Sequence, residues 1–400
     1  MTFLFFWIGQ ASFTLTSSVL QMSIMWYIAM ETGSAAMLSF ATLAGFLPQG
    51  IFSPFIGVIL DRYNRKSTLL LAGVGLASVN LVLVFAGFDG TIPIFLIFFI
   101  LFFRAIGLAF LNPSIQAIMP LIVPREELVK YAGYSQSFRS LSLVISPALA
   151  AVLFNIWNVS YIAVLDIVGA LFAVTILYHL KIVCTQKPEH HEMPHVLKEA
   201  KASIEILRKT NKLFSLFIIG AIYPLLFSPI GALYALITIS HFGGGITEVG
   251  IVETIFSIGM LAGSLLLGVM GKKINKMGSI VMSISIYGTG VLIIGLLPSS
   301  GFLMFVVISA IIGMANPFFT GMQTAIYQTY VKGEFLGRVL SLSSGTGMIT
   351  MSLGLVLSGI FAEQIGVTNW FFGTGILIII LAVVSAFVLI KKNVLGKQLS

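Results

Sequence analysis

Apolar stretches of similar length recur along this chain, separated by short segments rich in Gly, Pro or charged residues. A helix that crosses a bilayer needs roughly 20 mostly apolar residues, and about twelve stretches reach that length. A soluble domain carries about 25% charged residues, whereas this chain of 400 residues carries 9%. The apolar stretches are therefore predicted to lie in lipid, and the expected fold class is all-α and membrane-embedded.

The predicted spans allow a few residues of error at each end. Because the chain does not open with a basic segment before one short apolar run, no cleavable signal peptide is expected. An even number of spans places both termini on the same side of the membrane. The spans cover residues 3–30, 36–60, 67–87, 92–112, 134–156, 160–180, 213–240, 247–271, 279–297, 302–326, 336–362 and 368–390.

The cations indicate which side that is. Almost all of the 22 Lys and Arg residues lie in alternate connections, at their helix flanks or in the tail, and the opposite connections carry none. Such an asymmetry marks the cytoplasmic side, so both termini are predicted to be cytoplasmic. It also accounts for the net charge of +8 without a nucleic-acid partner. The cationic connections are 61–66, 113–133, 181–212, 272–278 and 327–335.

One long polar segment divides the chain into two halves. Residues 181–212 are predicted to be a cytoplasmic linker with an amphipathic helix on the membrane surface, between a six-helix bundle at 1–180 and another at 213–400. The halves resemble each other at an offset of roughly 200 residues, as in a duplicated bundle. The pair Asn112-Pro113 in the first half, for example, matches Asn316-Pro317 in the second.

Several chemistries are disfavoured by what the sequence lacks. No G-x-x-x-x-G-K-[ST] loop occurs, so an ion gradient rather than a nucleotide is the expected energy source. No cluster of catalytic residues lies in the apolar stretches, and neither an enzymatic activity nor a cofactor is expected. His190, His191 and His195 lie in the polar linker, where Pro194 interrupts any regular face, so no metal site is expected either.

The stretch "GVILDRYNRKS", residues 57–67, resembles the helix 2–3 signature of the major facilitator superfamily, G-x-x-x-D-R-x-G-R-K. Asn64 replaces the second glycine, and asparagine also tolerates a left-handed turn. The resemblance extends over the whole chain. The stretches "GQASFTLTSSVLQM", "AGYSQS" and "IGVTNWF" are most similar to the macrolide-efflux branch of bacterial drug exporters.

This resemblance implies a fold and a function. The fold is twelve transmembrane helices in two pseudo-symmetric six-helix bundles, in a bacterial plasma (inner) membrane, working as a monomer. The function is secondary active export of amphipathic drugs, macrolides among them, by proton antiport and rocker-switch alternating access. Its partners are a small amphipathic molecule, protons and the lipid bilayer. Two alternatives remain open: an exporter of a native metabolite such as a siderophore or lipid, and a receptor or scaffold that transports nothing.

For the signature itself, the resemblance implies a cytoplasmic gate. Asp61 would lie near the start of the eleventh helix, where the helix dipole favours an anion. Arg62, Arg65 and Lys66 would bind neighbouring helix ends or lipid phosphates. The alternative is that these cations only fix the topology of the chain.

Three charged residues in the apolar stretches are candidates for coupling protons to substrate: Arg104, Asp166 and Glu253. For Arg104 this role is what the family resemblance implies, and a structural ion pair is the alternative. A charge at the centre of a membrane helix costs at least about 2.5 to 3.5 kcal/mol, so Arg104 needs a partner or a wet cavity. Carboxyl groups hold a proton more readily in a low dielectric, which suits Asp166 first and Glu253 next as proton carriers. Glu31 and Glu248 are predicted to be interfacial.

Uncharged polar side chains on the spans are candidates to line a cavity, because lipid would not satisfy their amides. For the two asparagines that precede a proline, capping or kinking of a helix end is the alternative. Gly259 and Gly263 have the spacing of a helix-packing face. The cavity-lining candidates are Gln10, Gln21, Gln116, Gln323, Asn112 and Asn316.

Overall fold

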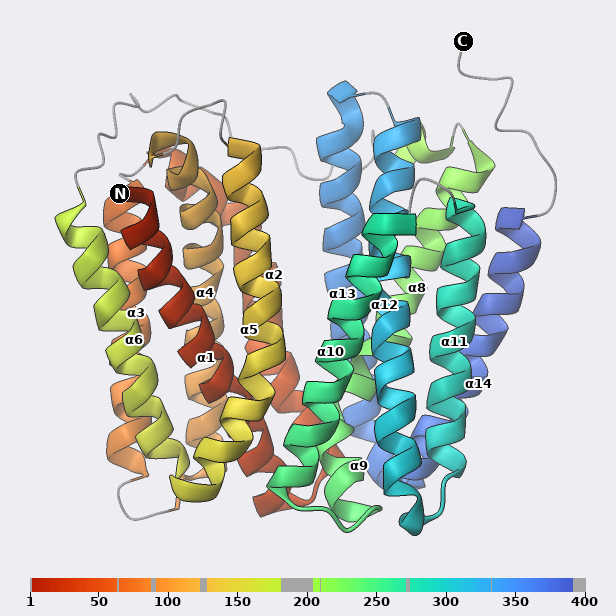
Figure 1. The fold of residues 1–400 in the computed structure, drawn as a ribbon, viewed down its shortest axis with the longest axis horizontal. Helices are drawn as coiled ribbons and strands as arrows, with labels where there is room; N and C mark the ends of the chain where they lie inside the picture. The colour runs from red at the N-terminus through yellow and green to blue at the C-terminus, as the bar shows by residue number, and fades with distance from the viewer. Residues whose placement is uncertain are drawn as a thin grey trace. The chain divides into compact units, whose positions relative to one another are not determined.

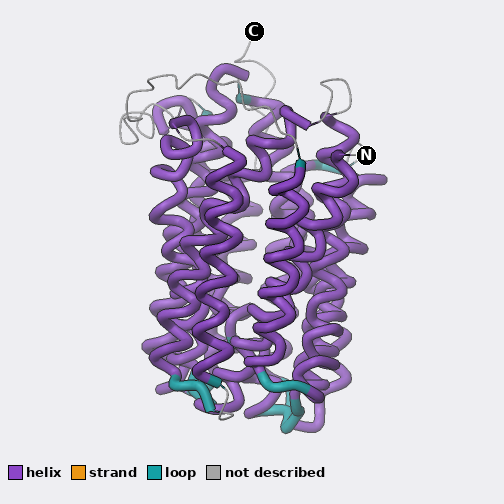
Figure 2. Tube along the Cα trace, turned by 90° about the vertical axis from the view of Figure 1, so that its left-hand side faces the viewer, coloured by secondary structure: helices purple, strands orange, loops and turns teal. Residues whose placement is uncertain are grey.

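The computed structural model describes residues 2–62, 65–87, 91–122, 128–180, 204–208, 210–270, 274–331 and 333–390. Within these ranges the chain forms helices joined by short loops, with no strand (Figure 2). Eleven helices in the described ranges are long and apolar enough to cross a membrane. A further helix of 29 residues contains the apolar segment Val144–Ile156. The predicted all-α membrane fold class is confirmed.

The N-terminal helices are drawn from red to yellow-green in Figure 1. Each helix pairs its own backbone N–H and C=O groups, which is the condition for a segment to lie in hydrocarbon. They are α1 (Thr2–Thr32), α2 (Ala35–Arg62), α3 (Arg65–Ala86), α4 (Ile94–Ile122), α5 (Leu128–Ile156) and α6 (Val159–His179).

The C-terminal elements are drawn from green to blue in Figure 1. They are α8 (Asn211–Ala232), α9 (Tyr234–Ser240), α10 (Ile246–Met270), α11 (Lys276–Leu296), η2 (Ser299–Gly301), α12 (Phe302–Tyr330), α13 (Gly333–Ile365), α14 (Val367–Ser385) and η3 (Ala386–Ile390). The last of these is a π-helical turn that continues α14.

Two predicted spans have the wrong extent. The predicted helix 213–240 is divided at Leu233 into α8 and α9, because Pro224 and Pro229 each remove a backbone donor shortly before the break. The predicted helix 92–112 continues to Ile122, because a membrane helix tolerates an internal proline where neighbouring groups satisfy the freed carbonyl. Asn112 therefore lies inside α4 and does not cap its end.

Local residues fix several helix ends. Asn158 begins α6 by accepting a hydrogen bond from the Tyr161 N–H (3.0 Å), and Asn275 caps α11 in the same way. Gly366, between α13 and α14, has a φ of 86°, a left-handed conformation that side chains with a Cβ rarely adopt. These residues end or begin the helices within a few positions and so keep the connections short.

The chain forms two compact units. The first unit contains residues 1–194 and 232–254, and the second contains 195–231 and 255–400. In the first unit, α6 packs on α1 and α3, and α4 packs on α2 and α3. In the second unit, α11 packs on α12 and α14. The domain boundaries predicted at 180 and 212 stay a prediction.

A glycine face joins two helices of the second unit. A Cβ on Gly259 of α10 would overlap the Ala310 carbonyl of α12, and one on Gly263 would overlap the Met314 carbonyl. Glycine therefore allows the two backbones to touch, as small residues do in membrane helix pairs. The predicted packing role of this pair is confirmed.

The predicted amphipathic helix of the linker falls largely outside the described residues. Residues 204–208 of it are helical, and Leu207 is fully buried. The Arg208 guanidinium lies 5.3 Å from the centre of the Phe214 ring at the start of α8.

Candidate functional site

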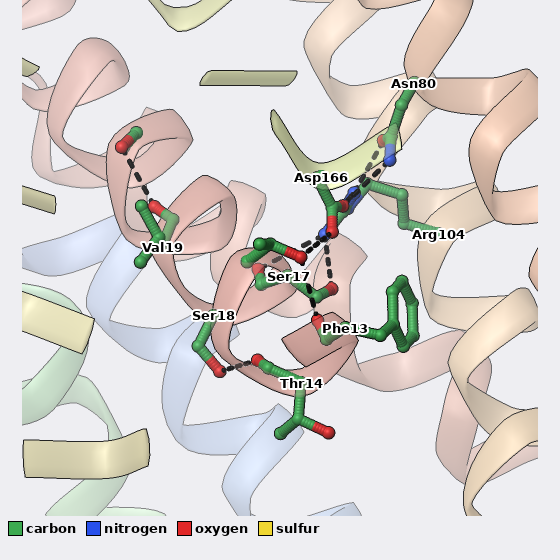
Figure 3. Close-up of polar contacts among 10 residues, drawn as sticks. Phe13, Thr14, Ser17, Ser18, Val19, Asn80, Arg104 and Asp166 are labelled. Atoms are coloured by element: carbon green, nitrogen blue, oxygen red, sulfur yellow. Dashed lines mark hydrogen bonds and ion pairs between the residues drawn. The ribbon is translucent and has the colours of Figure 1, made fainter. Parts of the chain in front are cut away.

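A fully buried ion pair lies in the first unit (Figure 3). Arg104 of α4 is 1% exposed and Asp166 of α6 is 0% exposed. The Arg104 Nη1 atom lies 2.8 Å from Asp166 Oδ2. The structure thus brings together two of the three predicted coupling residues, which are 62 positions apart in the sequence.

Asn80 of α3 bridges both members of this pair. Its Nδ2 donates to Asp166 Oδ2 (2.8 Å), and its Oδ1 accepts from Arg104 Nη1 (2.6 Å). Asn80 is itself completely buried. Sequence reasoning did not single it out, although an amide within an otherwise apolar stretch was the signal that could have identified it.

Helix α1 supplies the remaining contacts. Thr16 Oγ1 donates to Asp166 Oδ1 (3.0 Å). Arg104 Nη2 donates to Ser17 Oγ (2.9 Å) and lies 3.4 Å from the Ser17 carbonyl oxygen. Gly169 of α6 makes room for Thr16, because a Cβ there would overlap the threonine hydroxyl. Thr16 and Ser17 were also missed, since Ser and Thr more often bond to the carbonyl four residues back in a membrane helix.

The network therefore joins α1, α3, α4 and α6 around one negative and one positive charge. A buried pair is tolerated only when further hydrogen bonds satisfy both partners, and here Asp166 accepts from three side chains. The Arg104 Nε atom has no hydrogen-bond partner among the described residues. The Asp166 carboxylate is the only one that Arg104 contacts among the described residues, so the position of Arg104 depends on it.

Glu253 is held in a separate contact. Its Oε1 atom accepts a hydrogen bond from Trp26 Nε1 (3.0 Å), and Trp26 of α1 is 1% exposed. The Trp26 ring packs edge-on against Phe154 of α5, with ring centroids 6.4 Å apart. The third predicted coupling residue thus shares the first unit with Asp166 but has a different partner on α1.

The cavity-lining candidates have different surroundings. Gln10 is 4% exposed and lines a cavity of about 10 Å³, and its Oε1 accepts no hydrogen bond within the described structure. Gln21 is half-buried. The Gln323 side chain packs against Gly220 of α8, and Asn316 is 8% exposed. These side chains are not gathered in one described pocket, so a shared cavity stays a prediction.

The described part of the proposed gate is Lys66. Its Nζ atom donates to the Tyr178 carbonyl (2.9 Å) and the Leu180 carbonyl (2.8 Å) at the C-terminal end of α6, where a helix dipole favours a cation. Helix α2 ends at Arg62 and α3 begins at Arg65. The side chains of Asp61, Arg62, Arg65, Asn112 and Gln116 and the histidines of the linker lie outside the described residues.

Comparisons with known proteins show which family the chain belongs to. The chain is 41% identical to macrolide efflux protein A of Streptococcus pyogenes over 378 residues, which is 94% of this chain and 93% of that protein. It is 40% identical to macrolide efflux protein A of Enterococcus faecalis over 81% of this chain and all of that protein.

Solved structures agree on the fold. The structure of the nucleoside transporter NupG matches with a TM-score of 0.77 at 12% identity, covering 98% of this chain and 100% of that chain. The family model described as Major Facilitator Superfamily matches residues 6–233 and 216–398. The chain is therefore a multi-pass membrane protein that belongs to the Major Facilitator Superfamily.

Proposed function

We propose that this protein exports amphipathic drugs, macrolides among them, in exchange for protons. The relatives named macrolide efflux protein A, at 40% and 41% identity, support the substrate class and the direction of transport. The observation that carries the coupling proposal is the buried Arg104–Asp166 pair. A receptor or scaffold would not need to stabilise two opposite charges inside a membrane bundle.

In this proposal Asp166 is the proton carrier. While it is ionised, Asp166 holds Arg104, Asn80 and Thr16 in one arrangement. Protonation removes the negative charge that Arg104 contacts through Nη1. Arg104 then needs another acceptor, and its Nε, which has no partner among the described residues, is available to donate to it. The loss of this contact changes how α4 and α6 are held together, and that change is the link between the proton and the transport cycle.

The transport cycle proposed is rocker-switch alternating access between the bundles predicted at 1–180 and 213–400. Asp61 and the cations Arg62, Arg65 and Lys66 close the cytoplasmic side. The contact of Lys66 with the end of α6 supports a role at that side. The protein works as a monomer in a bacterial plasma membrane with both termini in the cytoplasm, as the distribution of Lys and Arg supports.

The test is the accumulation of a radiolabelled macrolide in a susceptible bacterium with and without this protein. Lower accumulation that a protonophore abolishes is the expected result, because collapse of the proton gradient removes the driving force. Unchanged accumulation, with the protein present in the membrane, would refute drug export and favour a native metabolite as the substrate.

Variants then test the coupling residues. Asp166→Asn and Glu253→Gln each replace a carboxylate by an amide of the same shape, and export is expected to fail in the first. Glu31→Gln is the matched control, because Glu31 is exposed at the end of α1. Export by Asp166→Asn at the wild-type rate would remove Asp166 from the mechanism.

A further inference from the structure

A cavity of about 350 Å³ lies in the first unit, away from the Arg104–Asp166 pair. Its walls come from the last turns of α1, from Gly87 and Ile92, and from the connection between α5 and α6. The lining residues that matter here are Tyr27, Gly87, Phe154, Asn155, Trp157 and Ser160. None of these residues was a candidate from the sequence.

Contacts between several elements hold the walls of the cavity in place. The Tyr27 hydroxyl accepts a hydrogen bond from the Ile92 N–H (3.0 Å), which fixes the connection between α3 and α4 against α1. Gly87 leaves room for Ser160, because a Cβ on Gly87 would overlap the serine hydroxyl. Asn155 Nδ2 donates to the Ala151 carbonyl (2.8 Å) and to Thr247 Oγ1 (3.1 Å). The walls are thus held by contacts from several helices.

The described side chains of the walls favour an uncharged ligand group. The described lining residues have no charged side chain, whereas Arg and Lys are the side chains that most often recognise a phosphate or carboxylate. Tyr27, Phe154 and Trp157 present aromatic surface, and Asn155 and Ser160 present polar atoms. Ser160 is 6% exposed, and its hydroxyl has no hydrogen-bond partner in the described part of the chain. A buried hydroxyl without a partner indicates a missing polar contact.

The position of the cavity connects it with transport. The connections that form it are opposite to the cationic ones, so the distribution of Lys and Arg predicts that they face the outside. Phe154, in the wall, packs on Trp26, and Trp26 donates to Glu253. A ligand in the cavity would therefore contact the residue that supports the indole partner of Glu253.

We propose that this cavity is an outer substrate site that binds an uncharged, hydroxyl-bearing ring of an amphipathic molecule. The aromatic side chains pack on the C–H faces of the ring, and its hydroxyl groups bond to Ser160 and Asn155. A volume near the lower limit for ligand sites suits one ring of a larger drug rather than the whole molecule. The assignment of the ligand as an exported drug rests on the proposed function.

The test uses cysteine labelling, because Cys184 is the only cysteine of the chain. In a Cys184→Ser background, Ile156→Cys places a thiol at a residue that is 66% exposed and lines the cavity, without removing an aromatic or polar side chain of the proposed site. A membrane-impermeant maleimide added to intact cells should label it from outside. Erythromycin at about ten times its half-saturating concentration should slow the labelling about tenfold, in proportion to the fraction of sites left empty.

The matched control is Tyr161→Cys in the same background. Tyr161 is 60% exposed and lies beside Ser160 in the first turn of α6, but it does not line the cavity. Its labelling should not change with erythromycin. Two results overturn the proposal: an Ile156→Cys thiol that is not labelled from outside, or one that is labelled equally fast with and without erythromycin in cells that export the drug.

A second variant measures transport directly. Ser160→Phe fills the cavity and should lower erythromycin export severalfold at an equal amount of protein in the membrane, and unchanged export overturns the proposal. If even the wild-type protein does not lower erythromycin accumulation, the proposed function fails instead. Such a ring could also belong to a lipid headgroup, and labelling of Ile156→Cys in reconstituted vesicles distinguishes the two sources. Protection by a glycosyl diacylglycerol, without protection by erythromycin, would assign the site to a lipid and overturn the substrate assignment.

Discussion

Replacing Asp166 by Asn tests the buried ion pair by removing one charge without changing the side-chain shape. Arg104, 1% exposed, keeps its positive charge and loses the only carboxylate that it contacts among the described residues. Breaking a buried pair in this way costs about 3–5 kcal/mol, because the remaining charge is left uncompensated. The two carboxylate oxygens of Asp166 accept from three donors. The amide of Asn replaces one of these oxygens by an NH₂ group, which donates and cannot accept.

The double variant Arg104→Gln/Asp166→Asn shows how much of the stability loss comes from an uncompensated charge and how much from changed hydrogen bonds. It leaves no buried charge, and its deficit is limited to mismatched hydrogen bonds, each worth about 1 kcal/mol. We therefore expect the double variant to be more stable than Asp166→Asn by about 2 kcal/mol, because it avoids the larger cost of an uncompensated buried charge. Both variants should lack proton-coupled export, because neither retains the carboxylate.

The assay is thermal unfolding of the purified proteins in one detergent, followed by intrinsic fluorescence. The expected order of transition temperature is wild type, then the double variant, then Asp166→Asn. An Asp166→Asn protein as stable as the wild type would refute the reasoning, since it would mean that Arg104 is not desolvated. A double variant less stable than Asp166→Asn would also refute the reasoning.

Three further predictions concern packing and the second acidic site. Gly259→Val should abolish accumulation of folded protein in the membrane, because its side chain meets a backbone carbonyl of α12, whereas Gly268→Ala, with no described atom within 4 Å of its Cβ, should express normally on an immunoblot. Trp26→Phe keeps an aromatic ring but removes the hydrogen bond to the α10 carboxylate, worth about 1 kcal/mol, and should lower macrolide export. Trp370→Phe makes the same change in ring size and is the control, because the Trp370 Nε1 has no partner within the described residues. Gly169→Ala should displace the α1 threonine hydroxyl from the buried aspartate and lower export without loss of protein, and normal export would show that this hydroxyl contributes nothing.

The sequence was sufficient to identify Arg104 and Asp166 as functional candidates, because a charge in an apolar stretch is costly and therefore rarely incidental. It was not sufficient to pair them. Asp166 and Thr16 are 150 positions apart in the chain, and their contact depends on how α1 packs on α6. The same is true of Asn80, whose amide is an ordinary polar residue until α3 places it between the two charges.

The approximate positions of the apolar spans and the predicted side of the membrane came from the sequence by itself, because these depend on local properties: the length of an apolar run and the charges beside it. The breaks were harder to predict, as the division at Leu233 and the extension of α4 show, since proline is tolerated wherever a neighbouring helix satisfies the backbone. Only the tertiary structure decided which polar groups meet. The ion pair, the Trp26–Glu253 hydrogen bond and the cavity around Ser160 each combine residues from helices that are far apart in the sequence, and their contacts are set by side-chain packing rather than by any local pattern.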